Sequence, residues 1–488
     1  MRKQSKRSFV LISIILGMFL SAIEATIVAT AMPSIVQDLG GFTLYSWVFS
    51  AYLLSSSATI LLFGKFADVY GRKPVYIIGI VVFLIGSTIA GFSHSMVLLV
   101  IARFIQGCGA GAIVPVASTI IGDIYSKEER AKIQGYLSSV WGISAILGPL
   151  IGAFFVEWLN WRYVFWMNIP LGLLSLFGIM LFLQEKVHHK EKQPFDIKGT
   201  LLLITSISVF MYVLVEGGIS VSWTSFFMYI LIGVTIISFI LFLIVERKSE
   251  QPIIPPSVWK YRLIRYANIT SLLTGAIILA VSSYLPVFVQ VVMEQPALIA
   301  GFTLTTMSIG WPIASSVAGR LLLKIGYRYT SLIGGIFLIV GAVLFNFLPS
   351  IQQAYWAALG SFFIGAGMGM TSTSFIVAIQ TTVKWEIRGI ATATNMFMRS
   401  IGSALGVAFF GGLLNNQIRR NIEDAPMATL TVSDIDHLLN GQILVSNESL
   451  TLLKQGLTSG LQFIYLMMGI ITILSFIMIL LIPKNESS

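Results

Sequence analysis

Charged residues are scarce in this sequence, and their scarcity decides the class of protein. Asp, Glu, Lys and Arg make up 11% of its 488 residues, whereas hydrophobic residues make up 56%. Roughly a quarter of the residues of a soluble domain are charged, and a water-soluble fold of this length could not hide so much apolar side chain. A lipid bilayer accepts apolar surface on the outside of a protein. The composition therefore excludes a soluble protein and predicts an all-α integral membrane protein.

Cysteine and histidine are also rare, which limits the chemistry that the chain can perform. The one cysteine, Cys108, lies inside an apolar stretch, and the four histidines lie between such stretches. These residues offer neither a disulfide framework nor the spacing of a metal site. The phosphate-binding pattern G-x-x-x-x-G-K-[ST] is absent, so direct drive by ATP has no support. We expect no metal, no cofactor and no enzymatic activity.

Apolar stretches recur along the chain, and each is close to the length of about 20 residues that crosses a bilayer as a helix. We expect fourteen such spans, at about 9–31, 45–64, 75–93, 96–119, 134–156, 163–184, 199–216, 224–245, 266–290, 299–319, 330–348, 353–379, 394–416 and 459–482. The first is too long for the apolar core of a signal peptide, and no A-x-A site follows it, so we expect it to remain a membrane helix.

Basic residues cluster in every second connection between these spans. If the N-terminus is cytoplasmic, most of the 31 Lys and Arg residues lie on the cytoplasmic side, where membrane proteins concentrate them. This pattern predicts cytoplasmic N- and C-termini and a multi-pass protein of the cell membrane. Because the charges lie in alternate short loops, the net charge of +10 indicates topology and not nucleic-acid binding.

The sequence repeats itself at long range, as the sequences of many transporters do. The segment GKFADVYGRK at 64–73 resembles GRLLLKIGYR at 319–328, and GPLIG at 148–152 resembles GSALG at 402–406 with nearly the same offset. The offset carries the second span onto the tenth and the fifth onto the thirteenth. We therefore expect an N-terminal six-helix bundle over 1–184, linkers with two inserted helices over 185–265, and a C-terminal six-helix bundle over 266–488 with an outer loop at about 417–458.

Two ionisable residues lie deep in the predicted spans. Glu24 is the only acid near the middle of any span, and Arg103 lies inside the fourth span. Charges at this depth are costly, face the protein interior, and are functional by default. A low dielectric favours the neutral form of a carboxyl group, so Glu24 can load and release a proton, or attract a cationic substrate when ionised. The alternative is a structural role, with both side chains serving only as hydrogen-bonding anchors.

Four motifs together resemble those of the major facilitator superfamily, specifically its fourteen-span drug–proton antiporters. They are GKFADVYGRK (64–73), RFIQGCGAG (103–111), GPLIG (148–152) and WRYVFWMNIP (161–170). The resemblance covers essentially the whole chain and implies two six-helix bundles plus two extra helices. It also implies export of small amphipathic or lipophilic drugs, often cationic, with protons as the coupling ion and alternating access to the two sides. We expect a small-molecule substrate and a monomer embedded in the lipid bilayer.

The same resemblance implies roles for single residues. Arg103 and Gln106 would tune the proton coupling of Glu24. A conformational latch would be formed by Asp68, Gly71 and Arg72, and the antiporter helix would depend on Gly135, Gly148, Pro149 and Gly152. The chain departs from the family pattern at Glu24, where aspartate is usual, and at Ser144 and Ala153, where glycine is usual.

Other charges are expected to play structural parts. We expect Arg162 to pair with Glu157, Asp123 to join a charge network with Arg130, and Arg399 to snorkel or to hold Glu386 or a helix end. Three other functions remain open. They are a dedicated exporter of one metabolite or antibiotic, a proton-coupled importer, and a membrane sensor built on a transporter body.

Overall fold

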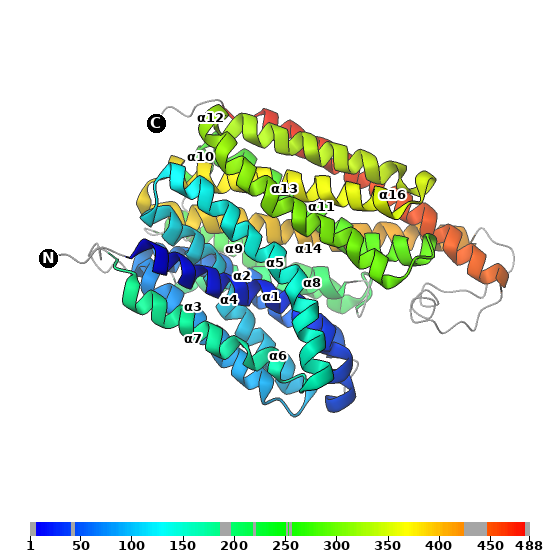
Figure 1. Ribbon diagram of the computed structural model, residues 1–488, viewed down its shortest axis with the longest axis horizontal. Helices are drawn as coiled ribbons and strands as arrows, with labels where there is room; N and C mark the ends of the chain where they lie inside the picture. Colours follow the sequence, from blue (N-terminus) through cyan, green and yellow to red (C-terminus); the bar gives the residue numbers. More distant parts are fainter. Residues whose placement is uncertain are drawn as a thin grey trace.

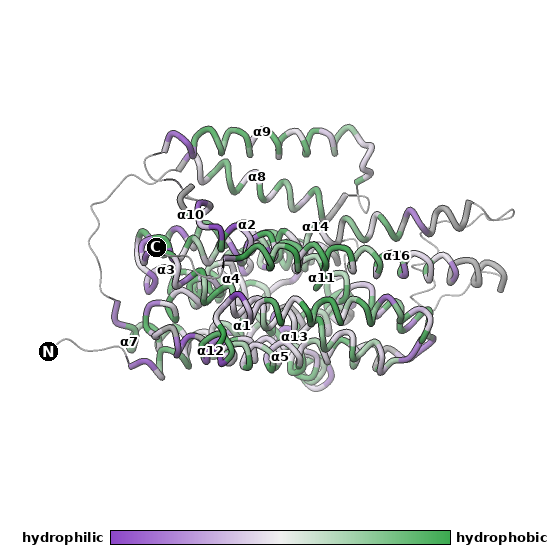
Figure 2. The backbone as a smooth tube through the Cα atoms, turned by 90° about the horizontal axis from the view of Figure 1, so that it is seen from above, coloured by the Kyte–Doolittle hydropathy of each residue, from purple (hydrophilic) through white to green (hydrophobic). Residues whose placement is uncertain are grey.

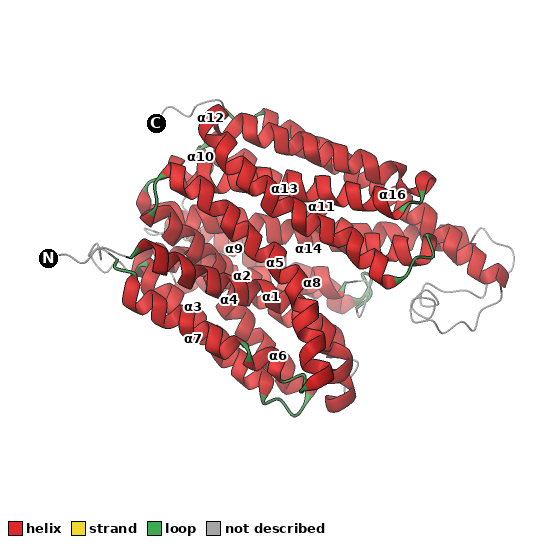
Figure 3. Cartoon of the chain, viewed as in Figure 1, coloured by secondary structure: helices red, strands yellow, loops and turns green. Residues whose placement is uncertain are grey.

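The chain is helical nearly throughout the part that its computed structural model describes, residues 6–40, 44–185, 197–217, 221–249, 252, 256–423 and 447–483. Figure 3 shows these helices. The described residues form no named strand, and the one isolated bridge pairs Gly217 with Val221. This outcome confirms the all-α prediction, since a helix satisfies its own backbone hydrogen bonds where water is absent.

The N-terminal half contains seven helices, which Figure 1 colours blue to blue-green. Gly71 separates the second helix from the third, with a positive φ of 98° that few other residues tolerate. Ser126 begins the fifth helix with a capping box shared with Glu129. The helices are α1 (Arg7–Leu39), α2 (Tyr45–Tyr70), α3 (Arg72–Gly91), α4 (Met96–Ile124), α5 (Lys127–Trp158), α6 (Tyr163–Trp166) and α7 (Asn168–Phe182).

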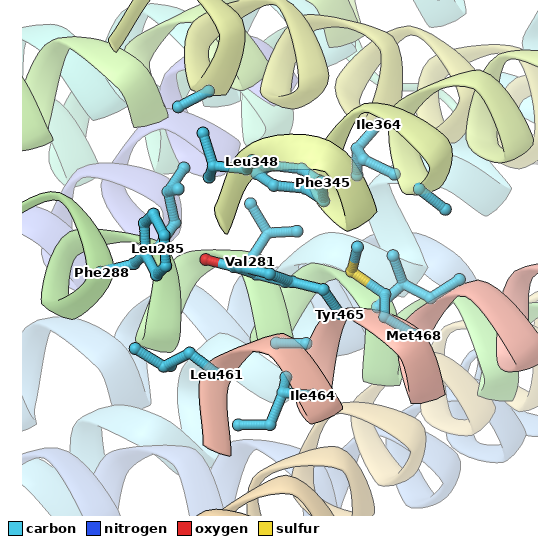
Figure 4. Packing of buried hydrophobic residues seen from close by; sticks show 14 of the residues in the cluster. Val281, Leu285, Phe288, Phe345, Leu348, Ile364, Leu461, Ile464, Tyr465 and Met468 are labelled. Atoms are coloured by element: carbon cyan, nitrogen blue, oxygen red, sulfur yellow. The ribbon is translucent and has the colours of Figure 1, made fainter. Parts of the chain in front are cut away.

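The C-terminal half is built from helices packed around an apolar core. Its elements are α10 (Pro256–Lys260), α11 (Arg262–Val287), the π-helical turn η2 (Phe288–Val292), α12 (Ala297–Ile351), α13 (Ala354–Thr382), the 3-10 turn η3 (Trp385–Ile387), α14 (Arg388–Glu423) and α16 (Asn447–Leu480). Figure 4 shows the centre of that core, where Phe345 stacks on Tyr465 with ring centroids 5.4 Å apart and Phe288 meets the same ring edge-on.

Two of the predicted spans, 299–319 and 330–348, lie within the single helical element α12. Its 55 residues include Gly326, whose φ of 80° and ψ of 171° are not helical. Figure 1 shows the ribbon turning back on itself at the α12 label, so its two parts run side by side. Only glycine adopts such a φ without strain, and Gly326 is the second glycine of the repeated loop motif. The tight turn explains why the two predicted spans appear as one element.

Two further helices lie beside the halves, as Figure 2 shows. They are α8 (Ile197–Glu216) and α9 (Phe226–Lys248). Leu203, Ile207 and Met211 of α8, with Phe242 of α9, share an apolar cluster with residues of α2 and α14. The inserted pair therefore packs over the seam between the halves and leaves most of α9 facing outward.

The described residues contain twelve helices that are long and apolar enough to cross a membrane, against fourteen expected spans. One of the twelve covers 53 residues of α12, and α8 contributes a shorter apolar stretch, Lys198–Leu214. The expected outer loop at 417–458 is narrower than predicted, because α14 continues to Glu423 and α16 already begins at Asn447. Residues 424–446, like 186–196 of the first linker, lie outside the described part. The domain boundaries at 184 and 265 remain a prediction.

The start of α1 and the end of α16 lie at one end of the molecule (Figure 1), which we call the terminal end. The connection between α2 and α3 and the start of α14 lie at the same end. The opposite end, the distal end, carries the connections between α1 and α2 and between α3 and α4. In Figure 1 the helices of the two halves are close together at the terminal end and diverge toward the distal end.

Candidate functional site

Glu24 and Arg103 form an ion pair inside the N-terminal half. The Arg103 Nη1 donates to Glu24 Oε1 at 2.5 Å, which joins α4 to α1. The same nitrogen donates to Gln106 Oε1 at 2.7 Å, one turn further along α4. Glu24 is 0% exposed, Arg103 1% and Gln106 0%. All three residues predicted for proton coupling therefore meet at one place, which is closed to solvent in this conformation.

The second carboxylate oxygen of Glu24 is held by a residue that the sequence analysis did not assign. Asn168 Nδ2, at the start of α7, donates to Glu24 Oε2 at 2.8 Å and contacts Ser87 Oγ of α3 at the same distance. Ser87 Oγ also accepts from Gln106 Nε2 at 3.2 Å and donates to the Phe165 carbonyl. Residues from α1, α3, α4 and α7 thus share one closed hydrogen-bond network.

An aromatic ring covers the arginine of this network. The guanidinium carbon of Arg103 lies 4.3 Å from the centroid of the Tyr52 ring on α2, and Arg103 Nε donates to the Val48 carbonyl at 3.1 Å. Cation–π contact and a carbonyl partner both stabilise a guanidinium in a desolvated place. The sequence offered a signal for Asn168, because it lies in WRYVFWMNIP, but little for Ser87 or Tyr52, which stand in unremarkable apolar helices.

The residues predicted to form a latch also lie together, and their contacts join the two halves of the chain. Asp68, near the end of α2, accepts from Arg72 Nη2 at 2.8 Å. It also accepts from the backbone N–H groups of Gly389 and Ile390, at 2.9 and 2.8 Å, at the first turn of α14. Free N–H groups and the helix dipole favour a carboxylate at that position. Asp68 therefore caps a helix of the opposite half.

Arg72 reaches across the same boundary. Its Nη2 donates to the carbonyl of Trp385 at 2.9 Å, and its guanidinium lies 3.9 Å from the centroid of the Trp385 ring. Its Nε lies 2.9 Å from Asp123 Oδ2 on α4. Asp123 also pairs with Arg388 at 2.6 Å. The expected charge network of Asp123 with Arg130 is present, since the two charges interact, but Asp123 pairs directly with Arg72 and Arg388 and so takes part in the contact between halves.

Gly71 and Gly64 serve the latch through their small size. Gly71 adopts its positive φ next to the Glu185 carboxylate, which accepts from the backbone N–H groups of Arg72 at 2.6 Å and Lys73 at 2.9 Å. A Cβ atom at Gly64 would lie 2.4 Å from the Cβ of Ala393 on α14, so no larger residue fits there. Glycine at position 64 therefore lets α2 and α14 approach closely, whereas Gly71 serves the turn through its positive φ.

The predicted antiporter helix, α5, contacts both halves through its glycines. A Cβ at Gly135 would lie 2.8 Å from the Cα of Ser316 on α12, whereas a Cβ at Gly148 would lie 2.0 Å from Thr26 Oγ1 on α1. Gly152 faces the Ile27 carbonyl of α1 in the same way. The helix continues without a break through Pro149. α5 therefore links the seam with α12 to the helix that carries Glu24.

Hydroxyl groups and an amide complete the contacts between the halves. Ser138 Oγ of α5 lies 2.7 Å from Ser315 Oγ of α12, and Ser315 Oγ is hydrogen-bonded to Thr373 Oγ1 of α13. Gln380 Nε2 of α13 donates to the Ser118 carbonyl of α4 at 3.0 Å. These contacts lie between the latch and the middle of the helices, so the halves are joined at and near the terminal end.

Two of the other expected partners differ from the structure. Arg162 pairs with Asp38 at 2.8 Å instead of Glu157, and Trp161 Nε1 donates to the same carboxylate. Asp38 lies at the end of α1, which brings it within reach of the turn before α6. The expected contact of Arg399 with Glu386 is not found among the described residues. Arg399 instead faces the ring of Trp311, with 6.0 Å between guanidinium carbon and centroid.

Comparison with known families and proteins places this geometry in context. The family described as Major Facilitator Superfamily matches residues 14–407. Multidrug resistance protein 3 of Bacillus subtilis is 38% identical over 423 residues, which cover 87% of this chain and 82% of that protein. The multidrug transporter protein MdtP of the same organism is 33% identical over 415 residues, covering 85% of this chain and 76% of its own length.

Solved structures share the fold at low sequence identity. The human organic anion transporter MFSD10 superposes with a TM-score of 0.67 and 13% identity, covering 98% of this chain and 100% of that one. The proton:xylose symporter XylE superposes with a TM-score of 0.65 and 14% identity, covering 98% and 96%. At these identities the likeness concerns the fold alone.

Proposed function

Because this chain belongs to the Major Facilitator Superfamily, we propose that it exports small amphipathic or lipophilic drugs, often cationic, in exchange for protons. It is a multi-pass, non-enzymatic transporter. The relatives named as multidrug transporters support the export of drugs. The observation that carries proton coupling is the buried network of Glu24, Arg103 and Asn168, since charges inside a membrane domain are rarely kept without a function.

A proton on Glu24 changes the balance of charge within this network. The ionised carboxylate neutralises Arg103 and accepts from Asn168. Protonation removes that charge and leaves Arg103 as a buried cation without its counter-ion, which is strongly unfavourable. Glu24 is also too well enclosed here to attract a cationic drug directly. We therefore place the coupling in the packing of α1 against α4 and α7, which must rearrange when the proton arrives or leaves.

The contacts between halves support an alternating-access mechanism. The latch of Asp68 and Arg72 with α14, together with the Gln380 and Ser315 contacts, holds the terminal end closed. The helices diverge toward the distal end (Figure 1). With cytoplasmic termini, this is an outward-facing conformation. Breaking the latch and closing the distal end would expose the region between the halves to the cytoplasm.

We also propose fourteen membrane spans in the cell membrane, with both termini cytoplasmic. The reversal of α12 at Gly326 supports two crossings by that element, and the insertion of α8 and α9 beside the seam supports two more. The bundles would comprise residues 1–184 and 266–488, with the insert at 185–265. We expect the transporter to act as a monomer in the bilayer, with protons as its coupling ion, no other cofactor and no nucleic-acid partner.

Ethidium flux in everted membrane vesicles under an imposed pH gradient tests this function. We expect gradient-driven uptake by the wild type and a loss of at least tenfold in Glu24→Gln, which cannot ionise. Glu157→Gln is the control, because this exposed acid on α5 lies outside the network. If Glu24→Gln retains gradient-driven uptake, another group carries the proton.

The vesicle measurement also separates the rival functions. If correctly folded wild type moves neither ethidium nor other unrelated dyes, a dedicated exporter of one metabolite becomes the better description. Uptake of dye by intact cells that depends on the inward proton gradient would indicate an importer. Saturable transport of any substrate would exclude a membrane sensor without transport activity.

A further inference from the structure

Arg399 differs from the other arginines that lie deep in the membrane domain. It lies eleven residues beyond the start of α14, roughly 16 Å along the helix, within the candidate span Trp385–Leu414. Arg72 and Arg103 each bind a carboxylate within 3 Å. In the part of the chain that the structure describes, the Arg399 guanidinium has neither an ion pair nor a hydrogen bond. A cation at this depth requires water, an anion or a polar partner.

The face of α14 that carries Arg399 is polar and incompletely buried. Ser400 and Ser403 share this face, and each is half-buried, as is Arg399. On one side of the face, Gly402 packs against the backbone of α11; on the other, Phe397 packs in the cluster with α2. The Arg399 side chain points toward α12, since its guanidinium lies over the Trp311 ring.

Trp311 is the residue of α12 that the Arg399 guanidinium faces. One turn further along α12, Ser315 contacts Ser138 of α5, and the Trp311 carbonyl lies against Gly369 of α13. Its side chain is half-buried. α12 meets the N-terminal half through α5, and α14 meets it through α2. The contact between Arg399 of α14 and Trp311 of α12 therefore lies between these two seams, on the surface of the C-terminal half. It follows the contacts that close the terminal end, on their distal side.

We infer that Arg399 and Trp311 form a substrate subsite that binds the carboxylate and the adjoining aromatic ring of aromatic acids and zwitterions. The guanidinium offers parallel N–H donors that match a carboxylate, and the indole offers a flat apolar surface for a ring. An arginine without a counter-ion would repel a purely cationic molecule, so the subsite extends the substrate range beyond cations. This inference rests on the proposed export function and names a substrate class for it.

Two dyes with the same aromatic body test the subsite. Tetramethylrhodamine methyl ester is a lipophilic cation, and its free acid is a zwitterion with an exposed carboxylate. Gradient-driven uptake of each is measured in everted vesicles. We expect wild type to move both, and Arg399→Gln to lose at least tenfold of the free-acid uptake while ester uptake changes less than twofold. Tenfold corresponds to about 1.4 kcal/mol, close to the lower limit of the range for a charged hydrogen bond.

Three further variants keep the result interpretable. Arg399→Lys keeps the positive charge but lacks the paired N–H donors, so uptake of the free acid should fall partway while uptake of the ester persists. This variant tests the subsite even if Arg399→Gln does not fold. Trp311→Leu should weaken uptake of both dyes, because both carry the ring. Arg328→Gln is the control, because this arginine donates to the Leu480 carbonyl at an exposed place.

The other outcomes contradict the inference in distinguishable ways. Equal loss of both dyes in Arg399→Gln would make the guanidinium structural. Wild type that moves the ester but not the free acid would overturn the subsite and leave the export function standing. Folded wild type that moves neither dye would count against the export function itself, and the subsite would fall with it.

Discussion

At the scale of single residues, Arg103 is paired with a carboxylate, whereas Arg399 has neither an ion pair nor a hydrogen bond among the residues that the structure describes. Arg103 has a carboxylate, an amide oxygen, a carbonyl and an aromatic ring around it, and it is 1% exposed. Such complete satisfaction is what makes a buried charge tolerable. It also makes the network sensitive to protonation, because the loss or gain of one proton leaves one group without its charge or hydrogen-bond partner.

Removing the amide that supports Glu24 should change the pH dependence of export. In Asn168→Leu the ionised carboxylate loses the donor at Oε2, so the protonated form is favoured and the midpoint of the pH–rate profile should move to higher pH. The expected shift is of order one pH unit, since a charged hydrogen bond contributes about 1.5 to 3 kcal/mol. Vesicle uptake measured across pH checks this prediction.

A half-buried asparagine in the other half provides the control for that experiment. Asn346 on α12 donates to carbonyls of Ala342 and Tyr465 within the C-terminal half. Asn346→Leu should lower stability without moving the pH profile. An unchanged profile in Asn168→Leu, at normal protein levels, would show that this amide has no part in proton coupling.

Asp38 offers a prediction about stability and pH outside the membrane spans. Hydrogen bonds from Trp161 and then Arg162 lower the pKa of Asp38 below its ordinary value. Its contribution to stability is therefore present above the ordinary pKa, near 3.9, and is lost as pH falls through the lowered value. Asp38→Asn should lower the melting temperature slightly at pH 7, by the equivalent of about 1 kcal/mol or less for an exposed pair.

The melting-temperature difference for Asp38 should disappear with acid. Wild type and Asp38→Asn compared in detergent should differ at pH 7 and converge only when the pH falls below the lowered pKa of Asp38, because the wild-type carboxyl is then neutral. A difference that persists unchanged in acid would mean that shape, and not charge, holds α1 to the turn before α6.

At the scale of whole helices, close approach between elements depends on small residues at particular places. α5 meets α1 at Gly148 and α12 at Gly135, so one helix has two tight contacts on different neighbours. In lipid, helices associate mainly through such van der Waals packing and hydrogen bonds. One departure from the family pattern on this helix fits this account, since Ser144 is fully buried and its carbonyl accepts from Thr26, whereas Ala153 is exposed.

Filling one of these contacts should destabilise the protein. The Cβ of Gly148→Ala would lie 2.0 Å from Thr26 Oγ1 and 2.9 Å from its Cβ, and overpacking of this kind costs about 1 to 3 kcal/mol. Gly233→Ala on α9 is the matched control, because nothing lies within 4 Å of the added atom. Melting in detergent should fall for the first variant only; equal melting would show that α1 and α5 separate easily.

At the scale of the whole molecule, one conformation is held by contacts gathered at the terminal end. Asp68, Arg72, Asp123 and Arg388 connect the halves through buried or half-buried charges. Removing one partner of a buried ion pair typically costs 3 to 5 kcal/mol, whereas a transporter must keep its conformations within a few kcal/mol of each other. We therefore expect these contacts to decide which conformation is populated.

Weakening the latch should open the terminal end. In Asp68→Asn, spin labels at Tyr70 and Glu386, placed in a Cys108→Ser background, should show a larger fraction of long distances than in the parent. The lone native cysteine makes this background simple. Glu129→Gln is the control, because its exposed pair with Arg7 lies within the N-terminal half. Identical distance distributions would show that Asp68 does not hold this end closed.

Much of this architecture was determined by hydrophobic pattern alone. Apolar stretches of spanning length predicted the helices, because a chain in lipid must satisfy its backbone within each segment. The exceptions have local causes. The tight turn at Gly326 joined two predicted spans in α12, and α14 and α16 extend into the predicted outer loop. Glu24 and Arg103 were also recognisable in the sequence, since a charge inside an apolar run stands out at once.

Which side chains meet was decided only by the tertiary structure. Asn168 lies 144 residues from Glu24, and Asp68 lies more than 300 residues from the backbone of α14 that it caps. No local pattern encodes such pairings, because they depend on how helices of the two halves pack and face one another. Hydropathy therefore determined where this chain crosses the membrane, and packing determined that Asp123 pairs across the seam and that Arg399 is left facing Trp311.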